Sequence, residues 1–246
     1  MRQQIPNFFT LSNLFCGCCA VVLLLYGKPV AAAWFTLGSF LFDYADGMVA
    51  RALGVSSPMG RELDSLADVL SFGLVPGVML YSMLQLPNCG PASGMILCEK
   101  ALPAFVLTAF SAYRLAKFNL DVRQKHYFMG LSTPGCTVFI LGLTLAAHDN
   151  QLGAGDLLFA QPWVLYVLTA LFSFLLVSDI PMYGMKIRSF RWKGNELAFT
   201  FIGLSIAALI FLKGLGLSLV VVFYIALSLF SKNKILAQGA ATSTTS

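Results

Sequence analysis

The sequence predicts an all-α integral membrane protein, a polytopic bundle of about eight transmembrane helices with both termini in the cytoplasm. Two observations lead to this fold class. Hydrophobic residues make up 58% of the 246 residues and charged residues only 11%, whereas soluble domains carry about 25% charged residues. The apolar residues also form long runs, and lysines and arginines are unevenly distributed between the segments that separate them. We expect one transmembrane domain over 1–235 and a disordered polar tail over 236–246.

Eight apolar segments are candidate spans, since a spanning helix needs about 20 predominantly apolar residues. They are 8–26, 30–53, 64–86, 100–119, 130–148, 162–182, 196–212 and 214–231. The first lacks a small-residue cleavage site and is interpreted as a span rather than a signal peptide. Turn-forming residues separate most segments, such as Gly27-Lys28-Pro29 after the first. The break between the last two is the weakest and is marked by Lys213-Gly214, and one long tilted helix is the alternative there.

The basic residues indicate the orientation of the chain. If all eight segments cross and both termini are inside, only Lys28, Lys100 and Lys213 of the 16 lysines and arginines fall outside. Cytoplasmic segments of membrane proteins carry this excess of positive charge. The connection between the second and third spans is therefore expected to face the cytoplasm.

Cysteines and glycines give three further expectations. Cys89 and Cys98 lie in an expected external loop, where a disulfide could form, although the sequence leaves this open. Cys16, Cys18 and Cys19 lie inside the first apolar run and are interpreted as packing residues. Gly73 and Gly77 form a small-xxx-small pattern that favours close helix packing, with a dimer face as the alternative.

An acidic cluster stands out against this apolar background. Asp43, Asp46, Asp64 and Asp68, with Glu62, give one short stretch five of the chain's 11 acidic residues. A carboxylate at membrane depth costs about 2.5–3.5 kcal/mol or more, and neighbouring carboxylates repel one another. The i, i+3 and i, i+4 spacings place each pair on one helical face. Oxygen-only ligands favour Mg²⁺ or Mn²⁺, and four carboxylates suffice for two ions about 3.5–4 Å apart.

Residues between the aspartates suit a phosphate ligand. Gly47 and Gly60 leave the helix backbone open to close approach, Arg51 offers a planar fork for a phosphate, and Ser57 offers a hydroxyl donor. Two alternatives are buried ion pairs between the aspartates and the arginines at 51 and 61, and the cation site of a transporter. Two arginines are too few to neutralise five acids, and transport sites usually span several broken helices.

The acidic stretch resembles the signature of the CDP-alcohol phosphotransferase family. It reads D-x2-D-G-x2-A-R-x8-G-x3-D-x3-D over 43–68 and matches every fixed position. Further segments resemble the phosphatidylserine synthase branch of that family: IPNFFTLSNLFCG at 5–17, LDSLADVLSFGLVPG at 63–77, YRLAKFNLD at 113–121, GLSTP at 130–134 and SDIPMYGMK at 178–186. Lys117 stands where the branch has a second arginine, which keeps the charge and loses the fork.

The resemblance implies a reaction and site roles. The phosphatidyl group of CDP-diacylglycerol would pass to the hydroxyl of L-serine, giving phosphatidylserine and CMP. Asp43, Asp46 and Asp64 would hold two Mg²⁺ or Mn²⁺ ions, and Asp68 would be both ligand and general base. The expected donor-binding residues are Asn7, Thr10, Gly47, Arg51, Ser57 and Gly60.

The acceptor side is less defined by the sequence. Arg114 is the candidate for binding the serine carboxylate, with Asn119 supporting it, and the rivals are Arg123, Lys125, Lys186 and Arg188. Glycerol-3-phosphate or inositol phosphate as acceptor stays open. The resemblance also implies a homodimer in the cell membrane with its catalytic site facing the cytoplasm, and no nucleic-acid partner.

Overall fold

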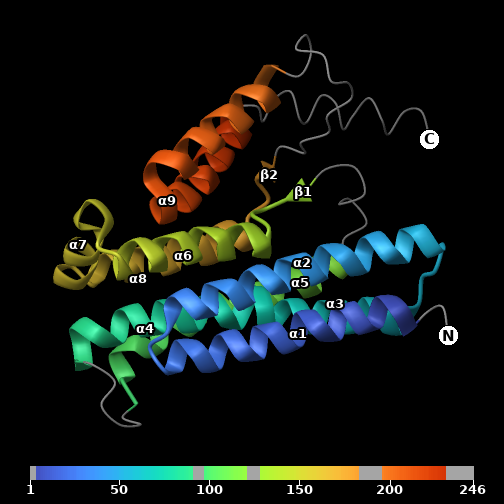
Figure 1. Ribbon diagram of the computed structural model, residues 1–246, viewed down its shortest axis with the longest axis horizontal. Helices are drawn as coiled ribbons and strands as arrows, with labels where there is room; N and C mark the ends of the chain where they lie inside the picture. The colour runs from blue at the N-terminus through green and yellow to red at the C-terminus, as the bar shows by residue number, and fades with distance from the viewer. Residues whose placement is uncertain (1–3, 91–96, 121–127, 183–195, 231–246) are drawn as a thin grey trace.

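The computed structural model describes residues 4–90, 97–120, 128–182 and 196–230, and most of them are helical. The expected all-α membrane fold is confirmed at this level, since long apolar helices make up the molecule (Figure 1). The expected tail at 236–246, both chain ends and the rival basic residues of the acceptor side lie outside the described residues.

The chain begins with two helices that lie side by side (Figure 1). Helix α1 (Gln4–Leu25) is joined to α2 (Pro29–Leu53) by a tight turn. Gly27 has a φ of 66°, which favours glycine, and Pro29 occupies the first turn of α2, where its missing N–H leaves no donor unpaired.

A nearly continuous helical rod follows. It consists of α3 (Pro58–Val69), a π-helical turn η1 (Leu70–Leu74) and α4 (Val75–Cys89). At a rise of about 1.5 Å per residue the rod is long enough to cross a bilayer whose hydrocarbon core is about 30 Å thick. The rod is therefore a candidate membrane span by length and composition.

The second half adds shorter elements and one long helical segment. These are η2 (Glu99–Phe105), α5 (Val106–Leu120), β1 (Phe128–Met129), α6 (Thr133–His148), η4 (Gln151–Gly153), α7 (Ala154–Ala160), α8 (Trp163–Val177), β2 (Pro181–Met182) and α9 (Glu196–Phe230). The two-residue strands β1 and β2 pair antiparallel.

Helix α9 is broken at the position where the sequence predicts a break. Lys213 has φ 44° and ψ −113°, which no helix contains. The rings of Phe201 and Tyr224 lie 6.3 Å apart, although about 35 Å would separate them along a straight helix. The chain therefore reverses at Lys213, and the alternative of one long tilted helix is wrong.

Within the described residues, three helical segments are long and apolar enough to cross a membrane: Gln4–Leu25, Pro58–Cys89 and Phe199–Phe230, the last of which includes the reversal at Lys213. A fourth span results if the helices Gln151–Leu158 and Trp163–Val177, bent by 100°, are taken together. The eight-span arrangement and the cytoplasmic termini stay predictions.

The structure shifts the predicted boundaries of the third and sixth spans and gives the fourth span a 3₁₀ start. The third begins at Pro58 rather than at residue 64, because Ser57 and Pro58 start the helix there. The fourth begins as the 3₁₀ segment η2, which contains Pro103. The sixth ends at Val177, because the chain continues into β2 rather than to residue 182 as helix.

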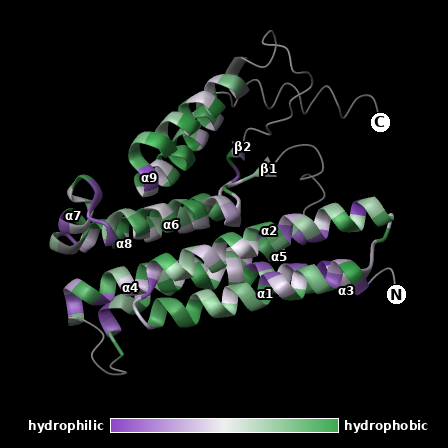
Figure 2. Ribbon diagram, in the orientation of Figure 1, coloured by the Kyte–Doolittle hydropathy of each residue, from purple (hydrophilic) through white to green (hydrophobic). Residues whose placement is uncertain are grey.

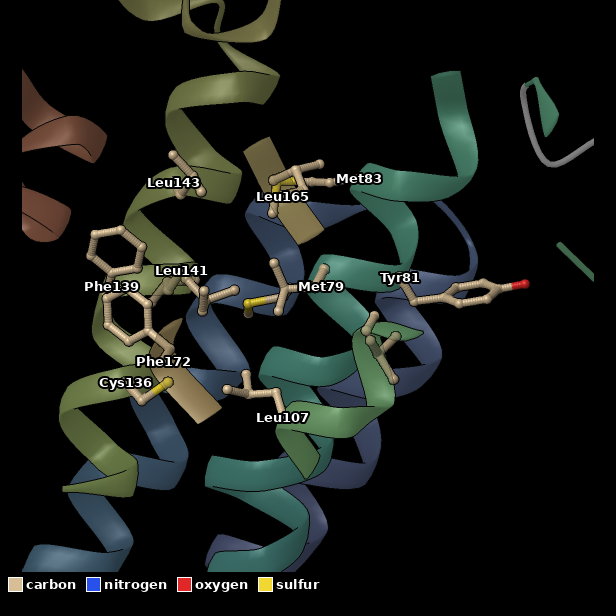
Figure 3. Packing of buried hydrophobic residues seen from close by; sticks show 14 of the residues in the cluster. Met79, Tyr81, Met83, Leu107, Cys136, Phe139, Leu141, Leu143, Leu165 and Phe172 are labelled. Atoms are coloured by element: carbon tan, nitrogen blue, oxygen red, sulfur yellow. The ribbon is translucent and has the colours of Figure 1, made fainter. Parts of the chain in front are cut away.

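The core lies between α4, α6 and α8 (Figure 3). The Phe139 and Phe172 rings stack with their centroids 4.1 Å apart, and Met79 and Leu165 are fully buried nearby. Figure 2 shows that hydrophilic residues gather on α3 and the facing part of α2, away from this core.

Gly73 and Gly77 serve the expected close helix packing. A Cβ at Gly73 would lie 3.1 Å from the Cβ of Ser111, and one at Gly77 would overlap the hydroxyl of Thr108. Both neighbours are on α5, so the small residues let α4 and α5 of the same chain approach.

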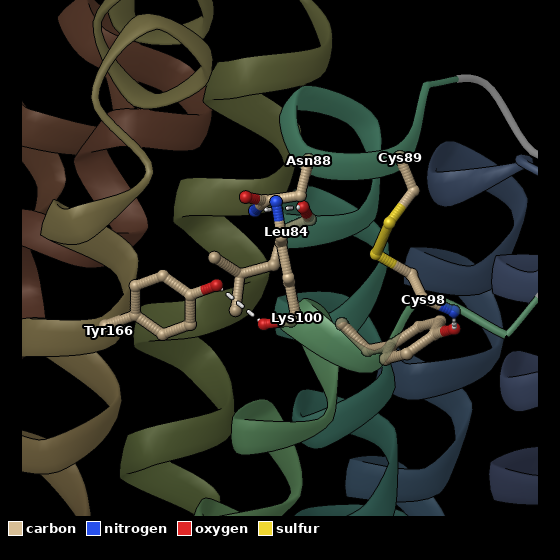
Figure 4. Close-up of a disulfide and its surroundings, with 7 residues drawn as sticks. Leu84, Asn88, Cys89, Cys98, Lys100 and Tyr166 are labelled. Atoms are coloured by element: carbon tan, nitrogen blue, oxygen red, sulfur yellow. Dashed lines mark hydrogen bonds between the residues drawn. A yellow bond between two sulfur atoms is a disulfide. The ribbon is translucent and has the colours of Figure 1, made fainter.

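Cys89 and Cys98 form a disulfide at the far end of α4 (Figure 4). The N–H of Cys98 donates to the Tyr81 hydroxyl at 3.1 Å, and the Tyr166 hydroxyl donates to the carbonyl of Lys100 at 2.6 Å. These contacts attach η2 to α4 and α8. The structure thus closes the question that the sequence leaves open.

The disulfide predicts a thiol count. Denatured protein prepared without reductant should react with a maleimide at four cysteines (16, 18, 19 and 136), and reduced protein at all six. Cys89→Ser should free Cys98 and give five reactive thiols without reductant. Intact mass spectrometry after labelling measures the count, and six reactive thiols in unreduced wild-type protein would contradict the pairing.

Candidate metal centre and adjoining pocket

The turn between α2 and α3 brings the two halves of the acidic cluster together. Gly54 ends α2 in the left-handed conformation with φ 62°, and its N–H and that of Val55 bond to carbonyls of the last turn of α2. Ser57 then caps α3 by accepting the N–H of Gly60 at 3.0 Å. The short turn places α3 beside the second half of α2.

Three of the four predicted metal ligands converge. Asp43 of α2 and Asp64 and Asp68 of α3 each offer an oxygen, and these oxygens all lie within 4.8 Å of one another. Helical spacing, read from the sequence, accounts for this convergence.

The donor set fits a divalent cation. Asp64 and Asp68 each keep one buried oxygen, Oδ1, without a hydrogen-bond partner. The ion pairs that described residues form among themselves join Lys117 to Asp179 and His148 to Asp149, and neither involves the cluster. The alternative of arginine-neutralised aspartates is therefore not supported within the described part of the chain. Clustered, unpaired carboxylates are suited to Mg²⁺ or Mn²⁺.

Asp46 stands slightly apart from the other three. It is 7% exposed, and its Oδ2 accepts a hydrogen bond of 2.6 Å from the Thr10 hydroxyl of α1. Asp46 therefore connects the acidic cluster to α1. It also forms part of the wall of a pocket, together with Asp64.

This pocket has a volume of about 150 Å³. Its lining residues come from the start of α1, the end of α2 and the start of α3: Pro6, Asn7, Thr10, Asp46, Gly47, Ala50, Val55, Ser56, Ser57, Gly60, Arg61 and Asp64. Five of the six residues predicted to bind the donor are among them. Pro6 and Val55 carried no signal in the sequence, because backbone position alone brings them here.

The two signature glycines keep the pocket open. A Cβ at Gly60 would lie 3.0 Å from Ser57 Oγ and 3.3 Å from Asn7 Oδ1. A Cβ at Gly47 would lie 3.3 Å from Arg51 Nη1, so the guanidinium extends back over this glycine. Arg51, the sixth predicted donor-binding residue, is exposed at the pocket's edge rather than part of its lining.

The π-turn η1 directly after Asp68 is a feature that the sequence did not reveal. It interrupts the regular helical ladder, and two of its carbonyls find partners on other helices. Thr137 of α6 donates to the Phe72 carbonyl at 3.1 Å, and Thr108 of α5 donates to the Gly73 carbonyl at 3.0 Å. The turn therefore joins the site to α5 and α6.

The predicted serine-binding residues lie near the cluster but have separate partners. Arg114 is buried, its Nη1 lies 3.4 Å from Thr133 Oγ1, and its charge interacts with that of Asp68. Asn119 is exposed and donates to Ser65 Oγ of α3 at 2.8 Å. Arg114 thus faces α6 and Asn119 faces α3, because five residues along a helix point in different directions.

Comparison with known proteins places this site in a family. Residues 3–177 match the family model described as CDP-alcohol phosphatidyltransferase. The chain is 33% identical over 200 residues to the CDP-diacylglycerol--serine O-phosphatidyltransferase of Bacillus subtilis (strain 168), covering 77% of this chain and 99% of that protein. It is 30% identical over 186 residues to the protein of that name from Methanocaldococcus jannaschii, covering 74% and 76%. It is 34% identical over 191 residues to the Mycobacterium leprae protein of that name, covering 74% of this chain and 59% of that protein.

The fold and the site define a helical membrane protein with an acidic cluster, suited to a divalent cation, beside a pocket. The chain belongs to the CDP-alcohol phosphatidyltransferase family, and it is a transferase of phospholipid biosynthesis.

Gly60→Ala should narrow the pocket without disturbing the helix. The added Cβ would press on Ser57 and Asn7, whereas alanine favours helix over glycine. One misplaced carbon in a binding pocket costs roughly tenfold or more, so we expect the KM for the CDP-linked substrate to rise by about that factor.

The matched control is Gly203→Ala in α9, where a Cβ would meet nothing within 4 Å. Steady-state kinetics on both variants, with thermal unfolding to check folding, measure the effect. Equal KM values for the two variants would remove Gly60 from the pocket's function.

Proposed function

We propose that this protein transfers the phosphatidyl group of CDP-diacylglycerol to the hydroxyl of L-serine, giving phosphatidylserine and CMP. The observation that carries the proposal is the convergence of Asp43, Asp64 and Asp68 beside a pocket lined by the other signature residues. The names of the relatives supply the substrates. Residues 1–235 act in this proposal as one catalytic domain with eight spans.

In the proposed donor complex, the CDP group occupies the pocket and the acyl chains stay in the lipid. Asn7 and Thr10 form the wall of the pocket that α1 supplies and would contact the cytidine. Gly47 leaves its backbone free for the diphosphate, and the Arg51 guanidinium beside it offers a planar fork to the phosphate oxygens. The Ser57 oxygen accepts the N–H of Gly60. This contact does not use the hydroxyl hydrogen, which Ser57 can donate to the substrate.

In the proposed reaction, Asp68 takes the proton of the serine hydroxyl. The hydroxyl oxygen of serine then attacks the phosphorus that carries diacylglycerol as the proton leaves. The new oxygen–phosphorus bond forms as the pyrophosphate bond breaks, and CMP leaves with the electron pair. A base is needed because an alkyl hydroxyl stays protonated near neutral pH. Two Mg²⁺ or Mn²⁺ ions held by the four aspartates would neutralise charge on the diphosphate and on CMP.

The position of Asp68 supports its assignment as the base. Its Oδ1 is buried without a partner, and it lies next to Asp43 and within electrostatic reach of Arg114. Arg114 would bind the serine carboxylate from the same side and so bring the hydroxyl toward Asp68. Asn119, tied to Ser65 of α3, would limit the acceptor side at the helix end.

Two independent observations support a cytoplasmic site. The rod from Pro58 to Cys89 carries Asp64 and Asp68 near one end and the disulfide at the other. Disulfides persist on the oxidising side of a membrane and are rare in the cytoplasm. The lysine and arginine distribution independently assigns the aspartates to the cytoplasm. The homodimer implied by the family resemblance stays part of the proposal.

One assay tests the acceptor. Purified protein with CDP-diacylglycerol and Mn²⁺ or Mg²⁺ should release CMP when L-serine is added, and far less with glycerol-3-phosphate or inositol phosphate. EDTA should abolish release, and excess divalent metal should restore it, because the aspartates lose their counter-charge with the metal. CMP release that depends on another alcohol would overturn serine as acceptor, and none with any alcohol would overturn the reaction.

Asp68→Asn should lower kcat by about 10²–10⁴-fold, the usual contribution of a general base. The KM for CDP-diacylglycerol should change little, since the pocket residues stay in place. The control is Asp156→Asn in α7, an exposed carboxylate that accepts from Asn150 far from the site. A wild-type rate for Asp68→Asn would show that another group accepts the proton.

A further inference from the structure

Asn13 of α1 is a buried polar residue without an evident role. Its exposed fraction is 0%, and neither Nδ2 nor Oδ1 has a hydrogen-bond partner. An amide that leaves water without gaining partners destabilises the folded state. Asparagine here is therefore a cost to stability that an apolar side chain would avoid.

The neighbours of Asn13 place it next to the metal centre. Thr10, one helical turn earlier on α1, donates to Asp46. The backbone carbonyl of Asn13 accepts from Ser39 Oγ at 3.1 Å and from Ser71 Oγ at 3.2 Å. Ser39 lies one turn before Asp43 on α2, and Ser71 lies one turn after Asp68 in η1. Asn13 therefore lies between the two helices that supply the ligands, about one turn deeper than the carboxylates.

Unpartnered buried atoms are concentrated at this end of the bundle. Among the described residues they are Asn13 Nδ2 and Oδ1, Asp64 Oδ1, Asp68 Oδ1, Arg114 Nε, Ser173 Oγ and Ser205 Oγ. The first five belong to the acidic cluster, to Asn13 and to Arg114, which interacts with Asp68. Polar atoms that lack protein partners in one place indicate a shared set of partners such as ordered water.

We propose that Asn13 is a positioning residue for the metal centre. Its amide binds water that also hydrogen-bonds to the carboxylates of Asp43 and Asp68, and this network fixes their orientation toward the cations. An amide suits the role because it both donates and accepts while adding no charge. Partners behind metal ligands commonly change metal affinity by about 10–100-fold. The inference rests on the metal centre of the proposed function.

The test measures Mn²⁺ binding directly, by electron paramagnetic resonance of free Mn²⁺ with purified protein and no substrate. Asn13→Ala should weaken binding by about tenfold or more. Asn13→Ser differs from Asn13→Ala by one hydroxyl oxygen, which can hold the water. The serine variant should therefore recover part of the Mn²⁺ affinity that the alanine variant loses. Asn13→Leu should weaken binding while leaving the unfolding midpoint of metal-free protein unchanged or higher, because an unpartnered amide is removed.

Thr36→Val is the matched control. Thr36 is also fully buried, on α2, and its hydroxyl bonds only to the Ala32 carbonyl of its own helix. The Mn²⁺ affinity of the Thr36→Val variant should equal that of the wild-type protein. Wild-type affinity in Asn13→Ala, or equal affinities in Asn13→Ala and Asn13→Ser, would overturn the role of Asn13 and leave the proposed function standing. Absence of Mn²⁺ binding by the wild-type protein would instead overturn the metal centre itself.

Discussion

The structure around the site depends on one constraint, the mutual repulsion of carboxylates. These carboxylates are enclosed together at one end of an apolar bundle. Asp43, Asp64 and Asp68 lie within 4.8 Å of one another through their oxygens, and Asp46 is close behind. No described arginine or lysine pairs with them. Their stability depends on partners that are cations, protons or water, and a site with this requirement is prepared for a divalent metal.

The surrounding helices hold the aspartates in place by contacts that do not neutralise them. The Thr10 hydroxyl fixes Asp46 from α1, and Ser57 fixes the start of α3. Behind Asp68, the π-turn gives its Phe72 and Gly73 carbonyls to threonines of α6 and α5. A π-turn separates the part of the rod that carries Asp64 and Asp68 from the packed helix α4. The acidic face and the core face can therefore each meet their own partners.

Features that depend on local periodicity could be predicted from the sequence. The convergence of Asp43 with Asp64 and Asp68 follows from helical spacing and one short turn, and so does the pocket around Gly60. The break at Lys213 was also visible, because a charged residue followed by glycine interrupts an apolar run. The eight spans are different, because length and composition alone support three or four of them.

Features that depend on contacts between distant segments could not be predicted in this way. Nothing in the spacing of 113–121 shows that Arg114 meets Thr133 while Asn119 meets Ser65. The π-turn has no residue signature, and its existence depends on threonines 35 and 65 residues away. The Cys89–Cys98 pairing could not be predicted without the position of Tyr81, whose hydroxyl accepts the N–H of Cys98. Asn13 looked like one polar residue in an apolar helix until its neighbours were known.

Helix α5 connects the two sides of the proposed reaction. Its small-residue contact with Gly73 and Gly77 brings it close to the rod that carries the base, and Arg114 lies on it within reach of Asp68. One turn later, Lys117 pairs with Asp179 at 3.1 Å and donates to the Val177 carbonyl, which ties α5 to the end of α8. A lysine is sufficient there, because this contact uses one carboxylate oxygen and one carbonyl rather than a planar fork. The departure of Lys117 from the arginine-rich family pattern is thus compatible with a structural tie at 117, and the acceptor role in the proposed reaction stays with the buried Arg114.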